Sequence, residues 1–367
     1  MWKKSIINIA LLSATLLTLV LFFDWSIDPY MKYRKNPSLK YLYEGNTYYD
    51  EERYINPGIA KNIDYNTAIV GTSMTENFDI DDVNSLLHVN SIKIPFSGGT
   101  AKELSTMLHY LISQKKAQTI IYDLDYFAFK GVDKTSAVPY VEPPFPNELY
   151  HSDFLSNMKY LSSIRTFTQS FKVLKHTYFE NKHRSFRDVY YWYDVCDFDE
   201  HAVVGLWKKR DTDKLLKSTY KKNEYKYDAL QENFNKYLLM HINHNKNIKF
   251  IIFLPPYSYL SWKIAQERGS IDSILTFREH ILRTLVQYKN VEIYDFQQEP
   301  FTFNLNNYKD FFHYSDDINY LMLEKFASKK DLVTTQNLEE HISSFQADRK
   351  KWLSAHPNLK LNDECEE

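Results

Sequence analysis

Residues 67–76 read Thr-Ala-Ile-Val-Gly-Thr-Ser-Met-Thr-Glu, and this stretch predicts both a strand and the point where it ends. The first four residues are apolar or β-branched, as is typical of a short buried strand. Ser73 follows the strand, with Glu76 three residues further on. One interpretation is a capping box in which Ser73 begins the next helix. The other is that Ser73 is a nucleophile on a sharp turn, where a helix N-terminus stabilises negative charge.

Four more apolar runs of strand length follow, with helical patterns between them. The runs are Val89 to Phe96, Thr119 to Phe129, Ile248 to Leu254 and Val291 to Phe296. Thr100 and Glu103 have the spacing of a capping box, ahead of a helix with one apolar face. Further helices are expected at residues 271–288 and around Ile318. This alternation predicts an α/β fold with three layers, a parallel sheet between helices, with ligands at the C-terminal ends of the strands.

Composition limits the classes of function. Of 367 residues 44% are apolar, which is enough for a sizeable core. Lys and Arg total 45 against 47 Asp and Glu, so the net charge of -2 disfavours nucleic acid as a partner. Cys196 and Cys365 do not have zinc-site spacing, and whether they pair is left open. His241 and His244 are interpreted as surface residues, so we expect no metal site, and no nucleotide motif predicts a cofactor.

The N-terminus predicts a membrane anchor. Residues 6–23 carry no charge and reach the lower length limit for a helix that spans a bilayer. The run ends in aromatic residues rather than in the small residues of a cleavage site, which favours an uncleaved anchor over a signal peptide. Lysines precede the run and aspartates follow it, which favours a cytoplasmic N-terminus. We therefore expect a single-pass protein of the cell membrane with its main domain outside the cytoplasm.

The rest of the chain predicts one globular unit with an insertion. Residues 1–5 would be a short cytoplasmic end, and residues 24–62 an irregular lead-in. A domain over residues 63–330 would follow, interrupted at about 139–245 by a helical insertion rich in Tyr and His. That insertion is interpreted either as a lid or partner surface or as structural packing on the sheet. Residues 331–367 are expected to form a solvated helical tail.

Two further motifs lie at strand ends. Ser97-Gly98-Gly99 follows the second predicted strand, and adjacent glycines in a chain with only eight indicate a tight turn with exposed amide donors. An ordinary left-handed turn is the alternative. Asp310 and His313 lie three residues apart after the last strand. A serine nucleophile needs a base, and that base needs an acid to fix its tautomer, so His313 and Asp310 are candidates for these roles.

With these three motifs the chain resembles the SGNH/GDSL hydrolase superfamily over roughly residues 65–327. Gly71-Thr72-Ser73 stands in the place of the family's GDS-like motif, Gly98 or Gly99 in that of its oxyanion glycine, and Asp310 with His313 in that of its D-x-x-H. The resemblance implies a flavodoxin-like α/β/α fold and a catalytic triad. It also implies an oxyanion hole formed by the amides of Ser73 and of Gly98 or Gly99.

One departure from the family pattern is plain. The third strand ends in Asp123 and Asp125, so the G-x-N-D block with its oxyanion asparagine is missing. A carboxylate cannot donate a hydrogen bond unless it is protonated, and what replaces the asparagine is left open. The two aspartates are expected to orient a neighbour or to bind a polar substrate. Tyr257 and Ser258, after the fourth strand, are further candidates for substrate binding.

The anchor narrows the resemblance to the membrane-anchored DltD, AlgJ and PatB families. It implies an extracytoplasmic serine O-acyltransferase or esterase that adds or removes an acetyl or D-alanyl group on a cell-envelope polysaccharide or teichoic-acid-like polymer. It also implies a membrane-bound O-acyltransferase as partner. The alternative is a non-catalytic SGNH-like module that binds polymer or scaffolds such a complex. The acyl group, the acceptor, the oligomeric state and the choice between transferase and hydrolase stay open.

Overall fold

The structure, a computed structural model, describes residues 2–34, 48–131, 145–175, 198–210, 222 and 224–355. Six strands form one sheet in the order β2-β1-β3-β4-β5-β6. The first five strands are parallel, and only β6 pairs antiparallel, with β5. Their bounds are β1 Thr67–Gly71, β2 Ser91–Pro95, β3 Thr119–Asp123, β4 Lys249–Leu254, β5 Val291–Asp295 and β6 Leu332–Val333. The predicted α/β fold with a mostly parallel sheet is confirmed.

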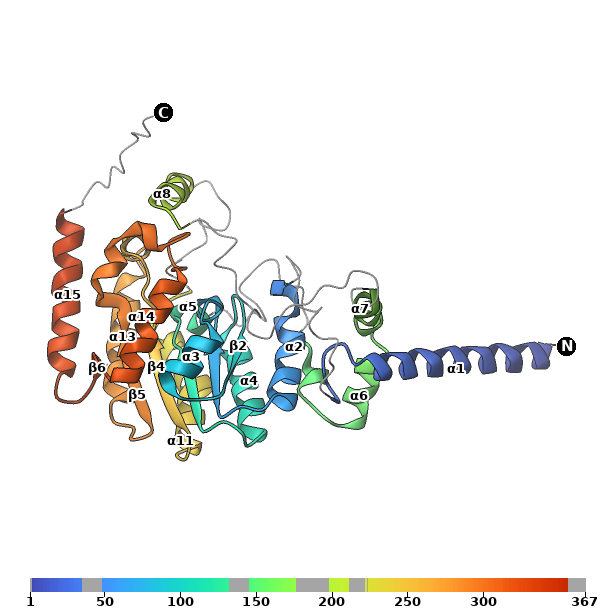
Figure 1. Ribbon diagram of the computed structural model, residues 1–367. Helices are drawn as coiled ribbons and strands as arrows, with labels where there is room; N and C mark the ends of the chain where they lie inside the picture. Colours follow the sequence, from blue (N-terminus) through green and yellow to red (C-terminus); the bar gives the residue numbers. More distant parts are fainter. Residues whose placement is uncertain are drawn as a thin grey trace.

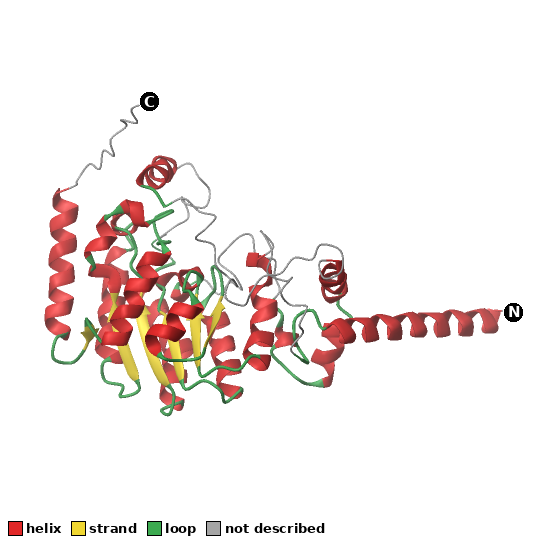
Figure 2. Cartoon of the chain, in the orientation of Figure 1, coloured by secondary structure: helices red, strands yellow, loops and turns green. Residues whose placement is uncertain are grey.

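Helices pack on the sheet from both sides (Figure 1), and the strands lie between them (Figure 2). The helices are α1 Trp2–Ile27, α2 Tyr48–Asn62, α3 Ile80–Leu87, α4 Ala101–Ser113, α5 Tyr126–Phe129, α6 Phe154–Leu161, α7 Ile164–Lys175, α8 Glu200–Lys209, α10 Tyr227–Phe234, α11 Met240–His244, α12 Tyr259–Glu267, α13 Ile271–Leu285, α14 Asp316–Ser328 and α15 Leu338–Ala355. A π-helical turn, Asn235–Leu239, joins α10 to α11. Within the described part of residues 139–245, every regular element is helical, as the sequence predicts.

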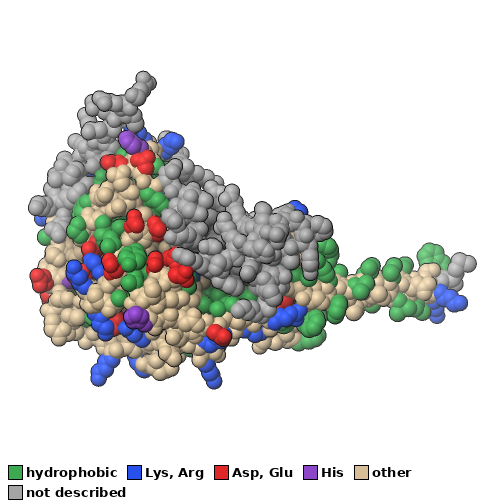
Figure 3. Space-filling view, viewed as in Figure 1, with side chains coloured by type: hydrophobic (Ala, Val, Ile, Leu, Met, Phe, Trp, Pro, Cys, Tyr) green, Lys and Arg blue, Asp and Glu red, His purple; other side chains and the backbone are tan. Residues whose placement is uncertain are grey.

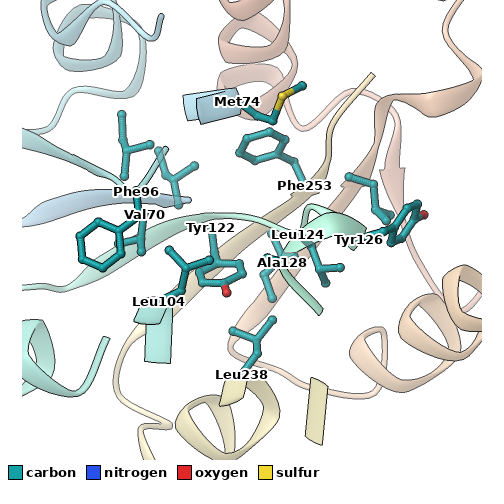
Figure 4. Packing of buried hydrophobic residues seen from close by; sticks show 14 of the residues in the cluster. Val70, Met74, Phe96, Leu104, Tyr122, Leu124, Tyr126, Ala128, Leu238 and Phe253 are labelled. Carbon is teal, nitrogen blue, oxygen red and sulfur yellow. The ribbon is translucent and has the colours of Figure 1, made fainter. Parts of the chain in front are cut away.

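The central strands are buried on both faces, which explains why they read as continuous apolar runs. Val70 of β1 and Tyr122 of β3 pack with Leu104 of α4 on one face of the sheet, whereas Phe253 of β4 lies on the other face near Met74 (Figure 4). The capping box predicted ahead of α4 is present, because the Thr100 side chain accepts from the Glu103 amide and the Glu103 carboxylate accepts from the Thr100 amide.

The strand order places the predicted site. The chain leaves β1 for β2 on one side and then crosses back to β3 on the other side of β1. This reversal is the switch point of a flavodoxin-like strand order, and ligands bind there, outside the carboxyl ends of the strands. Ser73 follows β1 directly, and Gly98 follows β2, which pairs with β1 up to Gly71 and Pro95.

One helix of the described chain, α1, is long and apolar enough to cross a membrane. Its most apolar stretch has a mean hydropathy of 2.4 and none of it is buried in the molecule. The run predicted at residues 6–23 lies inside α1, which extends a further turn at its C-terminal end.

Two predicted segments contain more packed regular structure than the sequence indicates. The lead-in at 24–62 contains α2, whose residues Ile55, Ile59 and Ala60 are buried against the domain. Packing of this face, and not intrinsic propensity, forms the helix. The tail is not a solvated appendage, because β6 extends the sheet and α15 buries an apolar stripe of Leu338, Ile342 and Phe345.

His241 is also not a surface residue. Its imidazole is buried and its Nε2 lies 2.8 Å from the Ser105 hydroxyl on α4. Burial, followed by the charges of His109 and His244, lowers the pKa of His241 to about 4. The ring therefore packs in the core as a neutral group, while His244 is exposed as expected. Cys196 and Cys365 lie outside the described residues.

Candidate active site

Three side chains that are far apart in the sequence meet beyond the carboxyl ends of the parallel strands. The Ser73 hydroxyl lies 2.7 Å from His313 Nε2, and His313 Nδ1 lies 2.7 Å from Asp310 Oδ2. This is the order of contacts of a Ser-His-Asp triad, in which the base bridges the nucleophile and the acid. The structure thus brings together the three residues whose roles the sequence predicts, although 240 positions separate Ser73 from His313.

The turn that carries Ser73 is capped by its neighbour. Thr72, and not Ser73, is the N-cap of a single 3-10 turn, Ser73–Thr75, and its hydroxyl accepts from the Met74 amide. The capping interpretation of Ser73 is therefore wrong, and its hydroxyl is directed to His313 instead. Gly71 is required beside this turn, because a Cβ there would lie 2.4 Å from Asp123 Cβ and 2.5 Å from Thr75 Cγ2.

The loop that carries the base is fixed at several points. A β-bridge between Tyr308 and Tyr314 closes it, and the Tyr314 hydroxyl donates to the Met74 carbonyl at 3.0 Å. Ser258 donates to the Phe311 carbonyl through both its amide and its hydroxyl. The loop is thus tied to the Ser73 turn on one side and to the end of β4 on the other, which fixes the position of His313.

Asp310 is held as a carboxylate. Its Oδ1 accepts from the amides of Phe312 and His313, both at 2.8 Å, while Oδ2 faces the imidazole. Burial opposes ionisation of this group, but the charge and hydrogen bonds of His313 outweigh it and bring the pKa of Asp310 below its ordinary value. An ionised Asp310 fixes the proton of His313 on Nδ1, which leaves Nε2 to accept the proton of Ser73.

The amides of the two adjacent glycines differ in their hydrogen bonds. Gly98 has φ +57, the left-handed conformation that favours glycine. The Gly99 amide donates to the Phe96 carbonyl at 2.7 Å, so Gly98 is the better candidate of the two glycines. Within the described chain, the amides of Ser73 and Gly98 have no hydrogen-bond acceptor. These two amides remain the candidates for an oxyanion hole.

The residues predicted to bind substrate are buried and support the turn instead. Asp123 is fully buried and its Oδ2 accepts from the Thr72 amide at 3.2 Å. Asp125 accepts from the Phe127 amide and from the Tyr257 hydroxyl. Tyr257 and Ser258 are exposed by 2% and 0%, which leaves no surface for a substrate. Of the two roles considered for the aspartates, the structure shows the one in which they orient a neighbour.

The hydroxyl of Thr72 reveals how protons are distributed in this network. It lies 2.9 Å from Asp123 Oδ2 and 2.9 Å from Asp125 Oδ2. One hydroxyl proton can be donated to only one of these oxygens, so the other contact requires a proton on a carboxyl group. Burial, and then the charge of Asp125, raises the pKa of Asp123 well above its ordinary value. Asp123 is therefore the protonated acid, and it donates to Thr72, which donates to Asp125.

Sequence reasoning missed a contribution from α2. The Glu52 carboxylate accepts from the Ser97 amide, and Arg53 donates to the Ser97 carbonyl at 3.3 Å. Arg53 also forms a buried ion pair with Glu103, whose carboxylate belongs to the α4 capping box. Helix α2 thus clamps the turn that presents Gly98. Its charged residues do not show this role in the sequence, because only the packing of α2 brings them to that turn.

Glu52 also meets Glu76, which follows the Ser73 turn. The two buried carboxyl groups are hydrogen-bonded to each other, a contact that requires a shared proton. Burial, and then the charge of Glu76, raises the pKa of Glu52 well above its ordinary value. The pair connects the turn after β1 to the turn after β2, the two turns that carry the candidate oxyanion donors.

The described residues contain no cluster of three or more His, Cys, Asp or Glu side chains that would hold a metal ion. The arrangement consists of a serine hydroxyl, an imidazole, a carboxylate and two backbone amides at the carboxyl ends of the strands. No protein-family model matches the chain, and no curated protein matches it.

Proposed function

We propose that the protein is a membrane-anchored serine acyltransferase or esterase of the SGNH type that acts outside the cytoplasm on an acylated cell-envelope polymer. The observation that carries this proposal is the continuous hydrogen-bonded chain from Ser73 through His313 to Asp310. The strand order, with Ser73 at the switch point, supports it as well.

The reaction begins when the Ser73 oxygen attacks the carbonyl carbon of an acyl ester. His313 Nε2 removes the hydroxyl proton as the new bond forms, and ionised Asp310 stabilises the resulting imidazolium. The amides of Ser73 and Gly98 donate to the carbonyl oxygen, which becomes negative. The imidazolium then protonates the departing alcohol, which leaves an acyl group on Ser73.

The second half of the reaction reverses these steps with a new hydroxyl. His313 removes a proton from the acceptor, whose oxygen attacks the acyl carbon and releases Ser73. If the acceptor is a sugar or polyol hydroxyl the protein is a transferase, and if it is water the protein is an esterase. A membrane-bound O-acyltransferase would supply the acyl group in the first case, as the resemblance implies.

A fluorophosphonate probe tests the nucleophile. The full-length chain in detergent is treated with the probe, and the modified peptide is identified by mass spectrometry. We expect an adduct on Ser73 that is lost in Ser73→Ala and falls by several orders of magnitude in His313→Ala. Ser113→Ala, at the exposed end of α4, is the matched control and should label as wild type does. Labelling of Ser73 that does not change in His313→Ala would contradict the mechanism, and a folded protein without any adduct favours the scaffold alternative.

A further inference from the structure

Two helices of the insertion, α6 and α7, pack against the C-terminal end of α1. Figure 1 shows α7 nearly end-on beside α1, which runs across the picture, so the two helix axes cross steeply. The Phe23 ring of α1 lies 5.8 Å from the Phe167 ring and 4.9 Å from the Phe171 ring of α7. The apolar surface of α1 therefore continues directly onto α7.

Polar contacts fix this junction. Asp24 is fully buried on α1 and its Oδ1 accepts from the Ser170 hydroxyl of α7 at 2.7 Å. Asp28, just after α1, accepts from the Tyr160 hydroxyl of α6 at 2.9 Å and from the amides of Lys32, Tyr33 and Arg34. The end of α1 is thus held by the insertion, and it is not a loose tether.

Helix α7 buries polar side chains and exposes two large apolar ones. Thr166, Gln169 and Ser170 are buried beside Val173, whereas Ile164 is 75% exposed and Phe171 is 52% exposed. In a helix on the surface of a soluble domain the apolar side chains face the core, so Ile164 and Phe171 depart from the usual pattern. The last turn of α7 also carries the exposed cations Lys172 and Lys175. Exposed apolar side chains together with lysines are the pattern of a helix that lies in a membrane interface.

Helix α6 adds to the same surface. Its first two residues, Phe154 and Leu155, are 75% and 76% exposed. At the end of α1, Trp25 is stacked under the Arg34 guanidinium, 4.7 Å from the ring centroid. Tryptophan and arginine at a helix end are typical anchors at the level of lipid head groups. Figure 3 shows hydrophobic side chains along α1 and again where α1 joins the domain.

We propose that α6 and α7 insert their exposed apolar side chains into the interfacial layer of the bilayer that α1 crosses. The occupant of this surface is lipid, because the apolar surface is continuous with the membrane-spanning helix and α7 lies across its axis. The arrangement fixes the height and orientation of the sheet relative to the bilayer. The inference rests on the proposed membrane anchor but not on the proposed catalysis.

Depth-dependent fluorescence quenching tests it in the full chain. Single cysteines replace Leu155 or Ile164 in a background of Cys196→Ser and Cys365→Ser, and each is labelled with bimane. The protein is reconstituted alone in vesicles of phosphatidylcholine and phosphatidylglycerol, with or without lipid that carries a quencher near the head group or, for the probe at Leu17 near the middle of α1, in the acyl chain. Leu17→Cys on α1 is the positive control. Leu321→Cys on α14, an exposed apolar site on the far side of the domain, is the matched negative control.

We expect the lipid quencher to remove roughly half of the fluorescence at Leu155→Cys and Ile164→Cys, and almost none at Leu321→Cys. If the two probes behave like Leu321→Cys while Leu17→Cys is quenched, α1 spans the bilayer but the inference is wrong. Probes that are shielded from aqueous iodide without quenching by lipid would show a protein covering, which also overturns it. No quenching at Leu17→Cys would refute the anchor itself. Fluorophosphonate labelling of the same samples reports separately on the proposed activity.

Discussion

The proton on Asp123 leads to a testable consequence for stability. Asp123→Asn places a permanent donor where we infer a protonated carboxyl group that donates to Thr72. The variant keeps this hydrogen bond but loses the longer bond, 3.2 Å, that Asp123 accepts from the Thr72 amide. Loss of one such neutral hydrogen bond costs about 1 kcal/mol. At pH 4, D123N should therefore be less stable than wild type by about that amount.

The difference should reverse as pH rises. In the unfolded chain the Asp123 carboxyl ionises with its ordinary pKa of 3.8, whereas burial and the charge of Asp125 raise its pKa in the folded protein well above that value. The folded state then binds more protons, so the contribution of this group to stability is complete below pH 3.8 and declines by about 1.4 kcal/mol per pH unit above it. Wild type should therefore lose stability relative to D123N as pH rises above 3.8, and the difference measured at pH 4 should shrink and then change sign.

Urea unfolding of the full chain in detergent, at pH values from 4 to 6, measures these free energies. Trp207 and Trp262 are buried in the domain, so their fluorescence reports its unfolding. Asp81→Asn, at an exposed position on α3, is the matched control and should run parallel to wild type. If D123N also runs parallel to wild type over this range, Asp123 is ionised in the folded protein and the proposed direction of donation through Thr72 is wrong.

Three further changes test other parts of the site and core. Gly98 has φ +57, so Gly98→Ala should lower the free energy of unfolding by about 1 kcal/mol and slow the labelling of Ser73 by the fluorophosphonate. The control is Gly205→Ala on α8, where a Cβ would meet open space; it should stabilise the helix and leave labelling unchanged. Ser258→Ala removes a hydrogen bond to the Asp310 loop, so we expect slower labelling of Ser73 at a stability cost of about 1 kcal/mol, measured by urea unfolding. Burial in the folded protein lowers the pKa of His241 from 6.5 to about 4. The contribution of its neutral imidazole to stability is therefore complete above pH 6.5, and about 3 kcal/mol is lost as pH falls toward 4. His241→Gln should reduce this loss in urea unfolding, and an unchanged dependence of stability on pH would contradict the buried neutral imidazole.

The sheet could be predicted because its strands are short apolar runs and its parallel arrangement follows from the helices between them. The predicted length of the third strand was wrong, because a helix cap interrupts the apolar run. The run Thr119 to Phe129 contains only one strand of five residues, since Asp125 caps the short helix α5 directly after it. The position of Asp125 beside β3 was visible in the sequence, but its capping role depends on the turn that the chain makes there.

The position of Ser73 could be predicted because it directly follows a strand of the parallel sheet. Asp310 and His313 were found by their spacing in the sequence, since a series of 3-10 turns separates them from β5. The support of the site could not be predicted in the same way. Glu52 reaches the Ser97 amide only because α2 packs beside β2 and α4, and no residue spacing records that contact. The choice between Gly98 and Gly99 could not be made from the sequence for a related reason, since it depends on the hydrogen bond that the Gly99 amide forms within the turn.

The two sides of Ser73 hold acids of opposite character, and this bears on what the site is for. On the side of His313, Asp310 has a lowered pKa and remains a carboxylate; on the side of Thr72, Asp123 has a raised pKa and remains an acid. Opposed shifts of this kind in neighbouring groups are typical of sites that move protons. A buried acid reduces stability by about 1.4 kcal/mol for each pH unit above its ordinary pKa, a cost that an amide at position 123 would avoid. We infer that the cost is kept because the hydrogen bonds of Asp123 hold the turn that carries Ser73, which the proposed catalysis would need and a scaffold would not.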